Sequence, residues 1–302
     1  MHFAQLLFPD FSLILIGYLV CRFTPLDRSV WEKIELLVYY FLFPVLLFYS
    51  VVKSPLNLGA TSSLIGAAWG LAAIGIALSY ALPYIPVLRQ FIDLRAHAAV
   101  AQIGFRFNTF LAFAIAERLA GAEGLALLAV IAAFCIPVLN VAAVWPMARH
   151  AERHFARELL RNPYILATVS GVVANLLGFA MPDWLVPTVS RLGASSLALG
   201  LLAAGAGLQL SAMAQNKVLG ASVLTIRHLI LPLAALGLAS LFKLSPVQTT
   251  ALLIFGAVPT SPNVYVLATR MGYDGASVSA LLTISTLLGL FSLPFALGVL
   301  RY

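Results

Sequence analysis

Residues 256–263 read Gly-Ala-Val-Pro-Thr-Ser-Pro-Asn, in the middle of an apolar segment that extends over residues 247–269. The length of that segment suits a helix that spans a membrane. Each of its two prolines removes a backbone N–H group and clashes with the carbonyl group one turn earlier, so a continuous helix is disfavoured. Broken helices inside a membrane occur where the freed backbone groups are buried in protein or line a water-filled cavity. The sequence therefore predicts a broken helix beside a binding site.

The composition of the chain places this segment in a membrane protein. Of 302 residues, 62% are hydrophobic and only 10% are charged, and the mean hydropathy is +0.99. Soluble domains carry roughly 45–50% apolar and about 25% charged residues, so most of this chain must face lipid. The net charge of +7 is attributed to orientation in the membrane, with no nucleic-acid partner. Cys21 and Cys135 show no metal-ligand spacing, and we expect neither a metal nor a cofactor.

Ten apolar segments are long enough to cross a membrane, for which about 20 apolar residues are needed. Their bounds are 6–21, 34–52, 63–82, 97–116, 125–147, 163–179, 187–208, 218–241, 247–269 and 277–300. We therefore expect an all-α integral membrane protein with ten transmembrane helices.

The basic residues set the expected orientation. With the N-terminus outside the cell, 11 of the 18 Lys and Arg residues lie in cytoplasmic loops, five lie outside, and Arg106 and Arg227 lie within spans. Residues 148–162 form the longest and most basic loop, which the positive-inside rule assigns to the cytoplasm. Both termini are therefore expected to be extracytoplasmic, in a multi-pass protein of the cytoplasmic (inner) membrane.

The two halves of the chain share spaced landmarks. Pro9 matches Pro163 at an offset of 154 residues, and Asn108 matches Asn263 at an offset of 155. Five spans on each side of the basic loop force the second half to be inverted in the membrane. We expect two inverted five-helix repeats, which are typical of secondary transporters. The bounds are 1–147 for the first repeat, 148–162 for a basic cytoplasmic linker and 163–302 for the second repeat.

The counterpart of the proline-rich segment is residues 104–109, Gly-Phe-Arg-Phe-Asn-Thr, in the fourth span. It contains a glycine and polar residues but no proline, and we expect a second break there. An asparagine stands at both matching positions, Asn108 and Asn263. An amide can satisfy freed backbone groups and also offer a donor and an acceptor to a substrate. The alternative is that both asparagines only cap half-helices, and the two roles are compatible.

Five short motifs carry a family resemblance: FRFNT (105–109), GAEG (121–124), VPTSPNVYVLA (258–268), MGYD (271–274) and TIST (283–286). With Pro44 and Pro163, they resemble the auxin efflux carrier family, ten-helix permeases within the bile-acid/sodium-symporter-like fold group. The resemblance implies a scaffold from helices 1, 2, 6 and 7 and a mobile transport domain from helices 3–5 and 8–10. It also implies that helices 4 and 9 cross at their breaks and that the scaffold forms a homodimer.

Arg106 lies two residues before Asn108, inside the fourth span. A cation at midspan costs at least about 2.5–3.5 kcal/mol on insertion scales, so it is expected to be paired or functional. Its guanidinium group can bind a carboxylate through two parallel hydrogen bonds, which favours an anionic substrate. The alternatives are a pairing with Glu35, Glu117 or Glu123, or a side chain that extends towards a membrane surface.

Arg227, His228 and Glu35 are candidates for coupling or gating. His228 lies in the eighth span and can titrate near neutral pH; the alternative is a histidine that only hydrogen-bonds between helices. No acidic residue lies plainly at a midspan, whereas proton-driven transporters usually carry an Asp, Glu or His relay there. The simplest expectation is transport driven by membrane potential, with proton coupling through His228 or Glu35 as the second choice. Neutral hydroxyl groups near the breaks leave sodium coupling open.

Together these features predict a carrier of small organic anions, such as mono- or dicarboxylates, that works by alternating access. The expected substrate-binding residues surround the two breaks: Arg106, Asn108, Thr109, Pro259, Thr260, Ser261, Pro262 and Asn263. The alternatives are a proton- or sodium-coupled symporter of the same fold and, in a different class, a channel or a membrane sensor. An enzyme is not expected, because the sequence has no HExxH motif, no pair of midspan aspartates and no Gly-x-Ser-x-Gly elbow.

Overall fold

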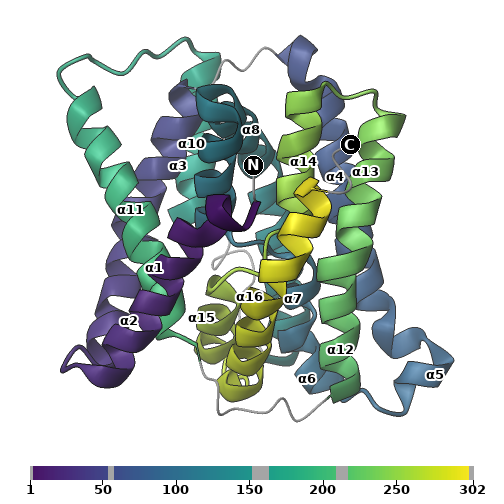
Figure 1. Cartoon of the computed structure of the whole chain (residues 1–302). Coiled ribbons are helices and arrows are strands. Elements are labelled where there is room, and N and C mark those ends of the chain that lie inside the picture. Colours follow the sequence, from purple (N-terminus) through teal and green to yellow (C-terminus); the bar gives the residue numbers. More distant parts are fainter. Residues whose placement is uncertain (1–2, 54–57, 152–162, 209–216, 299–302) are drawn as a thin grey trace.

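The computed structural model describes residues 3–53, 58–151, 163–208 and 217–298. Over these residues the protein is helical and contains no β-strand. Most of the helices run along a common direction, as in a bundle that crosses a membrane (Figure 1). The predicted basic linker lies mostly outside the described residues, which stop at residue 151 and resume at residue 163.

The helices have the following bounds. They are α1 (Phe3–Phe23), α2 (Arg28–Leu37), η1 (Val38–Leu42), α3 (Phe43–Lys53), α4 (Leu58–Ala81), η2 (Leu82–Tyr84), α5 (Pro86–Arg89), α6 (Leu94–Val100), α7 (Gln102–Phe105), α8 (Thr109–Ala151), α10 (Pro163–Leu176), α11 (Val186–Ala206), α12 (Lys217–Thr225), η3 (Ile226–Ile230), α13 (Leu231–Leu241), α14 (Pro246–Ala257), α15 (Asn263–Arg270) and α16 (Gly275–Gly298). α8 combines two helices, which meet at Gly121 with φ of 57°. η1 and η3 are π-helical turns inside longer helices.

Seven helical segments are long and apolar enough to cross a membrane, judged by length and composition. They are Arg28–Lys53, Thr61–Tyr84, Leu94–Gly121, Glu123–Met147, Val186–Ala206, Lys217–Leu241 and Gly275–Gly298. Each contains most of one predicted span. The other three predicted spans coincide with α1, with α10 and with the pair α14 and α15. Ten spans in two inverted repeats therefore stay a prediction.

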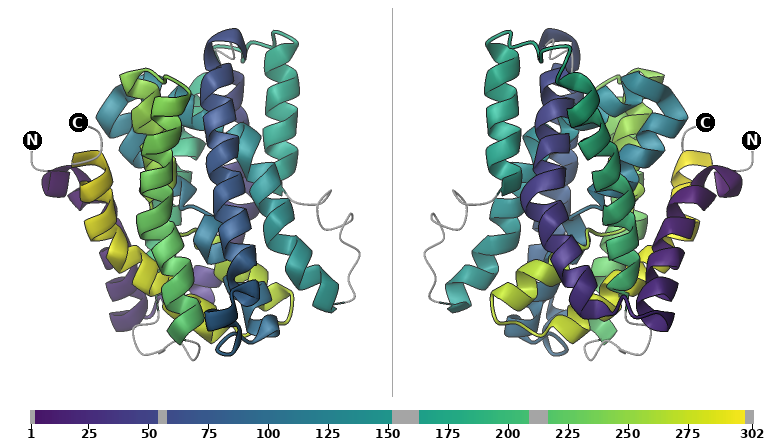
Figure 2. Two further views of the ribbon diagram at one scale, coloured as in Figure 1. Left: turned by 90° about the vertical axis from the view of Figure 1, so that its right-hand side faces the viewer. Right: turned by 90° about the vertical axis from the view of Figure 1, so that its left-hand side faces the viewer.

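The helices pack as two groups that meet along α8. In the first group, α1 packs on α11, while α3 packs on α10 and α11 (left in Figure 1). In the second group, α13 packs on both α4 and α14, and α16 packs on α14 and α15. α8 contacts α4 and α14 as well as α3, α10 and α11. The groups also touch where α1 lies beside α16, at one edge of the side views (Figure 2).

Two glycines allow α1 and α11 to approach closely. A methyl group on Gly17 would lie 1.9 Å from the carbonyl oxygen of Leu202. A methyl group on Gly205 would lie 1.8 Å from the carbonyl oxygen of Ile14. Small residues that let two backbones touch are the usual basis of helix association in membranes, where water does not drive the contact. Any larger residue at either position would push these two helices apart.

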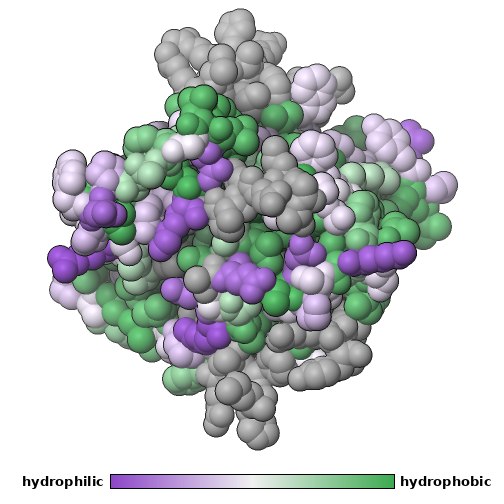
Figure 3. Space-filling view, turned by 90° about the horizontal axis from the view of Figure 1, so that it is seen from above, coloured by the Kyte–Doolittle hydropathy of each residue, from purple (hydrophilic) through white to green (hydrophobic). Residues whose placement is uncertain are grey.

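The outer faces of the helices are apolar. Phe41, Val173 and Phe291 are all strongly exposed, and Phe291 keeps 74% of its surface accessible. Large apolar side chains that are exposed on many helices are costly in water but are expected where lipid covers the protein. One end of the bundle, by contrast, shows hydrophilic side chains scattered among the hydrophobic ones (Figure 3). Such a surface is expected where the helices leave the membrane.

Local signals mark where two of the helices begin. The carboxylate of Asp27 accepts hydrogen bonds from Ser29 and from the backbone of Val30, which caps α2 and lowers the pKa of Asp27. α14 begins with a capping box, in which the hydroxyl of Ser245 accepts from the N–H group of Gln248 at 3.3 Å and the Gln248 side chain accepts in return at 3.0 Å. These caps determine where α2 and α14 begin, and both helices contribute to the site described below.

Candidate functional site

Two broken helices meet in the centre of the structure. α7 is separated from α8 by residues 106–108, and α14 is separated from α15 by residues 258–262. The chain is extended at the first residue of each break, with ψ of 149° at Arg106 and 148° at Val258. Both predicted breaks are therefore present, the first of them without a proline.

A backbone hydrogen bond joins the two breaks. The N–H group of Asn108 donates to the carbonyl oxygen of Pro259 at 2.8 Å, so the breaks cross in direct contact. The side chain of Asn108 turns the other way, and its Oδ1 accepts from the N–H group of Leu111 at 3.1 Å. Asn108 thus caps the start of α8, the second of the two roles considered for it.

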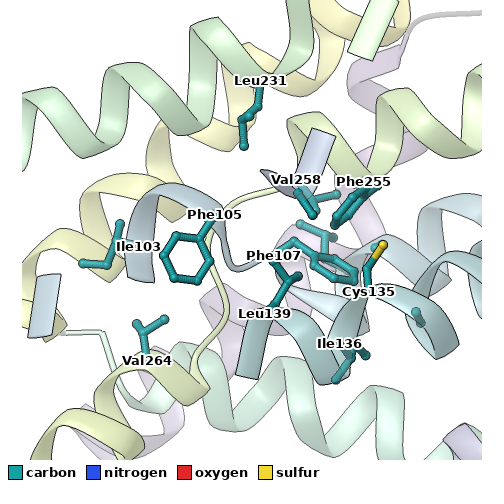
Figure 4. Packing of buried hydrophobic residues seen from close by; sticks show 14 of the residues in the cluster. Ile103, Phe105, Phe107, Cys135, Ile136, Leu139, Leu231, Phe255, Val258 and Val264 are labelled. Carbon is teal, nitrogen blue, oxygen red and sulfur yellow. The ribbon is translucent and has the colours of Figure 1, made fainter. Parts of the chain in front are cut away.

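Apolar side chains seal the crossing. Phe107 in the first break makes an edge-to-face contact with Phe255 of α14, with the ring centroids 4.7 Å apart. Val258, Cys135 and other buried apolar residues surround this pair (Figure 4). Cys135 has no exposed surface and serves there as an apolar side chain. The sealed crossing keeps lipid away from the polar groups beside it.

Arg106 is buried at the crossing, with 8% of its surface exposed. Its guanidinium donates to Oε1 of Gln102 at 3.2 Å and to Oδ1 of Asn140 at 2.9 Å. Gln102 is held in turn, because its Nε2 donates to the carbonyl oxygens of Ala99 at 3.0 Å and Val264 at 3.1 Å. These two amide oxygens are neutral acceptors that orient the guanidinium at the crossing.

A small cavity of about 20 Å³, here called the crossing cavity, lies beside this guanidinium. Its lining combines residues of both breaks, of α8 and of α15: Arg106, Phe107, Thr109, Ile136, Leu139, Asn140, Ser261 and Asn263. Nδ2 of Asn140 and Oγ1 of Thr260 are buried and find no hydrogen-bond partner among the described residues. A cavity of this size holds about one water molecule. The crossing must therefore widen before anything larger than a water molecule can occupy it.

The second break holds further polar groups, of which Ser261 lines this cavity. The N–H group of Thr260 donates to Oγ of Ser285 on α16 at 2.9 Å. The hydroxyl of Ser261 accepts from the N–H group of Asn263 at 3.3 Å, and Pro262 stands at the N-cap position of α15. Unlike the buried Asn108, Asn263 is half-buried and lines two cavities.

The larger of those two cavities, about 380 Å³, is here called the vestibule. It lies between α2, α11 and α15, and it is lined by Arg28, Glu32, Glu35, Leu36, Val38, Tyr39, Phe110, Gly200, Ala203, Ala204, Pro262, Asn263, Tyr265 and Thr269. Glu35, a candidate for coupling, is therefore in the wall of the vestibule, where it pairs with Arg28. Asn263 stands between the vestibule and the crossing cavity.

Comparison with known proteins identifies the family of the chain. A family model described as "Membrane transport protein" matches residues 2–297, nearly the whole chain. The chain belongs to the auxin efflux carrier family of membrane transport proteins. It is also 25% identical over 328 residues to a protein of Rhizobium meliloti (strain 1021) described as "Putative malonate transporter", with 98% of this chain and 95% of that protein covered. The protein is accordingly a multi-pass membrane protein, and the resemblance found in its motifs is confirmed.

Arg227 lies on the π-helical turn η3 and is fully buried. Its Nε donates to the carbonyl oxygen of Val258 at 2.8 Å and its Nη2 to that of Phe255 at 2.6 Å. Both carbonyls belong to the end of α14, where the break leaves them without their usual helical partners. The positive charge also faces the negative end of the helix dipole. Arg227 therefore serves as a cap for the first half of the broken helix.

His228 bridges the same break to α16. Its Nε2 lies 2.8 Å from Oγ of Ser285, and its Nδ1 lies 2.9 Å from Oγ of Ser292. Ser292 donates to the carbonyl oxygen of Ala257 at 3.3 Å, and Ser285 accepts from the N–H group of Thr260. His228 thus connects the two sides of the break through two serines, a hydrogen-bonding role of the kind considered as its alternative.

Sequence reasoning missed the partners that position these side chains. Gln102 and Asn140 were not among the predicted site residues, and neither was Ser292. Gln102 stands one helical turn before Arg106, and Asn140 is an amide in the middle of an apolar span; both are signals that the sequence displays. Within the part of the chain that the structure describes, no group of three or more His, Cys, Asp and Glu residues could hold a metal ion.

Proposed function

We propose that the protein carries small organic anions, mono- or dicarboxylates, across a membrane by alternating access. The observation that carries this proposal is the buried guanidinium of Arg106, oriented by Gln102 and Asn140 towards the crossing of two broken helices. A guanidinium fits a carboxylate through two parallel, charge-assisted hydrogen bonds. Thr109, Ser261 and Asn263 would complete the site with neutral donors, and Pro259, Pro262 and Thr260 would shape it. The description of the Rhizobium meliloti relative supports a dicarboxylate.

The same proposal includes the arrangement in the membrane. The ten predicted spans would form two inverted repeats, with helices 4 and 9 as the broken pair. The first helix group would be the scaffold, and through it a homodimer would form, as the family implies. The second group would be the moving transport domain. The excess of basic residues in the predicted inner loops supports extracytoplasmic termini in the cytoplasmic membrane, so the vestibule, with Arg28 at its wall, would open towards the cytoplasm. No catalytic step is proposed.

The test is uptake of labelled malonate by proteoliposomes that contain the purified protein. Saturable uptake, inhibited by unlabelled carboxylates but not by amines or neutral amides of the same size, is the expected result. A carrier shows counterflow, in which unlabelled substrate inside accelerates uptake of label, and its turnover is far below that of a channel. The absence of uptake for every mono- and dicarboxylate tried would contradict the proposal.

The driving force is expected to be the membrane potential. A potential imposed with potassium and valinomycin should accelerate malonate uptake when the interior is positive, in the absence of sodium and of a pH gradient. The reason is that no acidic residue lies plainly at the middle of a span, while the proposed substrate itself carries negative charge. A strict sodium requirement would contradict this prediction. A strict requirement for a pH gradient would also contradict it, and would indicate that transport is coupled to protons through His228 or Glu35.

The two matched asparagines are expected to respond differently to replacement by alanine. Asn263→Ala should raise the KM for malonate about fivefold with little change in thermal stability, because its side chain lines the substrate path. Asn108→Ala should lower stability by about 1 kcal/mol, because it removes an N-cap. Thermal unfolding and uptake kinetics are measured on both variants. An unchanged KM in Asn263→Ala would show that Asn263 does not contact the substrate and only stands at the start of α15.

A further inference from the structure

A second cation faces the substrate path, at some distance from the crossing. Arg28 is the only basic side chain among the described residues that line the vestibule. The volume of the vestibule, about 380 Å³, falls within the range of small-molecule sites, roughly 300–1,000 Å³. Asn263 lines both the vestibule and the crossing cavity, so the two cavities adjoin at this residue.

Arg28 holds a carboxylate already. Its Nη1 lies 2.7 Å from Oε1 of Glu35 and its Nη2 lies 3.1 Å from Oε2, a bidentate pair. The side chains of Arg28 and Glu35 keep 29% and 22% of their surface accessible. Glu32 approaches less closely, with Oε1 at 3.7 Å from Nε and 58% of its side chain accessible. The guanidinium is therefore reachable from the vestibule while it is paired.

Arg28 also connects the two helix groups. Its Cζ lies 5.6 Å from the ring centroid of Tyr265, which belongs to α15 just beyond the second break. Its Nη1 lies close to the C-terminal end of α11, 3.5 Å from where a Cβ atom on Gly207 would stand. The π-face of the tyrosine and the negative end of the helix both favour a cation in this place. The guanidinium thus stays in position when its carboxylate partner changes.

We propose that Arg28 is a second, exchangeable carboxylate site, at which a substrate anion replaces Glu35 before it reaches the crossing. The proposal rests on the proposed function. The exchange breaks the two hydrogen bonds from Arg28 to Glu35 and forms two equivalent bonds from Arg28 to the substrate. Glu35 keeps 22% of its side chain accessible, so its carboxylate turns towards the water of the vestibule when the substrate anion takes its place. Glu35 acts as an internal competitor that keeps the site from holding substrate too tightly.

Two neutral substitutions distinguish this exchange from an ion pair that only supports the fold. Arg28→Gln removes the anion site and is expected to raise the KM for malonate about tenfold. Glu35→Gln removes the competitor and is expected to lower the KM about threefold. Effects of opposite sign are the signature of competition, whereas loss of a structural pair would move both variants in the same direction. Glu32→Gln serves as the matched control, with a smaller decrease than Glu35→Gln because its contact is longer and more exposed.

The measurement is malonate uptake into proteoliposomes. Uptake by each variant is divided by its amount of folded protein, which its thermal unfolding curve gives. Arg28→Lys keeps the charge but loses the bidentate geometry, and is expected to raise the KM about threefold, so it replaces Arg28→Gln if that variant does not fold. Wild-type KM in the Arg28 variants, or an increased KM in Glu35→Gln, would overturn the proposal. A wild-type protein that transports no carboxylate would instead refute the proposed function, so the two failures are distinguishable.

Discussion

Arg227→Leu is expected to lower the free energy of unfolding by about 2–6 kcal/mol, because it leaves two buried carbonyl groups without a donor at about 1–3 kcal/mol each. These are the carbonyls of Phe255 and Val258, which the guanidinium binds at 2.6 and 2.8 Å. An opposing effect is that leucine removes a buried charge, whose desolvation is itself costly. We expect the loss of the two hydrogen bonds to be the larger effect, because the broken helix offers no N–H group of its own to these carbonyls.

Thermal unfolding in detergent, followed by tryptophan fluorescence, measures the effect. Arg191→Leu is the matched control, because Arg191 lies exposed on α11 and the same chemical change there should leave the unfolding midpoint almost unaltered. Arg227→Lys keeps the charge but cannot reach both carbonyls with a fixed fork, so its midpoint should lie between those of wild type and Arg227→Leu. A midpoint for Arg227→Leu equal to that of the Arg191 control would show that the break does not depend on this cap.

The features of the fold that the sequence predicted are those with a local cause. Pro259 and Pro262 break a helix through the geometry of their own rings, so the second break is visible without any knowledge of the rest of the chain. The seven long apolar segments follow from composition in the same way. The break at residues 106–108 has no proline, and its extended backbone is instead stabilised by the contact with Pro259, about 150 positions further along the chain.

The roles of side chains were less accessible to sequence reasoning, because direction is set by the tertiary structure. Asn108 and Asn263 occupy matching places in the two halves, yet one is buried as a helix cap and the other lines two cavities. Arg106 and Arg227 look alike in sequence as cations inside spans. In the structure Arg227 holds backbone carbonyls, whereas Arg106 faces a cavity and is oriented by two amide side chains. Neither distinction follows from periodicity or composition.

Substitution at Arg106 is expected to have the largest effect on transport. Arg106→Gln should reduce the kcat/KM for malonate uptake at least about 100-fold, since two hydrogen bonds between a charged donor and a carboxylate contribute about 1.5–3 kcal/mol each. Arg106→Lys should retain part of the affinity through its charge but lose the parallel pair of bonds, so its defect should be smaller yet still large. Gln102→Leu should also weaken transport, because it removes one of the two amides that orient the guanidinium.

A control on α8, the helix that follows the first break, separates an effect on folding from an effect on binding. Arg118 is exposed on α8, so Arg118→Gln makes an identical chemical change and should transport malonate at the wild-type rate. Arg106→Gln should reach the membrane and unfold near the control, because glutamine can still hydrogen-bond beside Gln102 and Asn140, and the crossing cavity has room for a water molecule. A loss of transport without a loss of stability would place Arg106 in the substrate path. Wild-type carboxylate flux in Arg106→Gln would exclude it from the anion site and would leave the guanidinium, like that of Arg227, as a support for the broken helices.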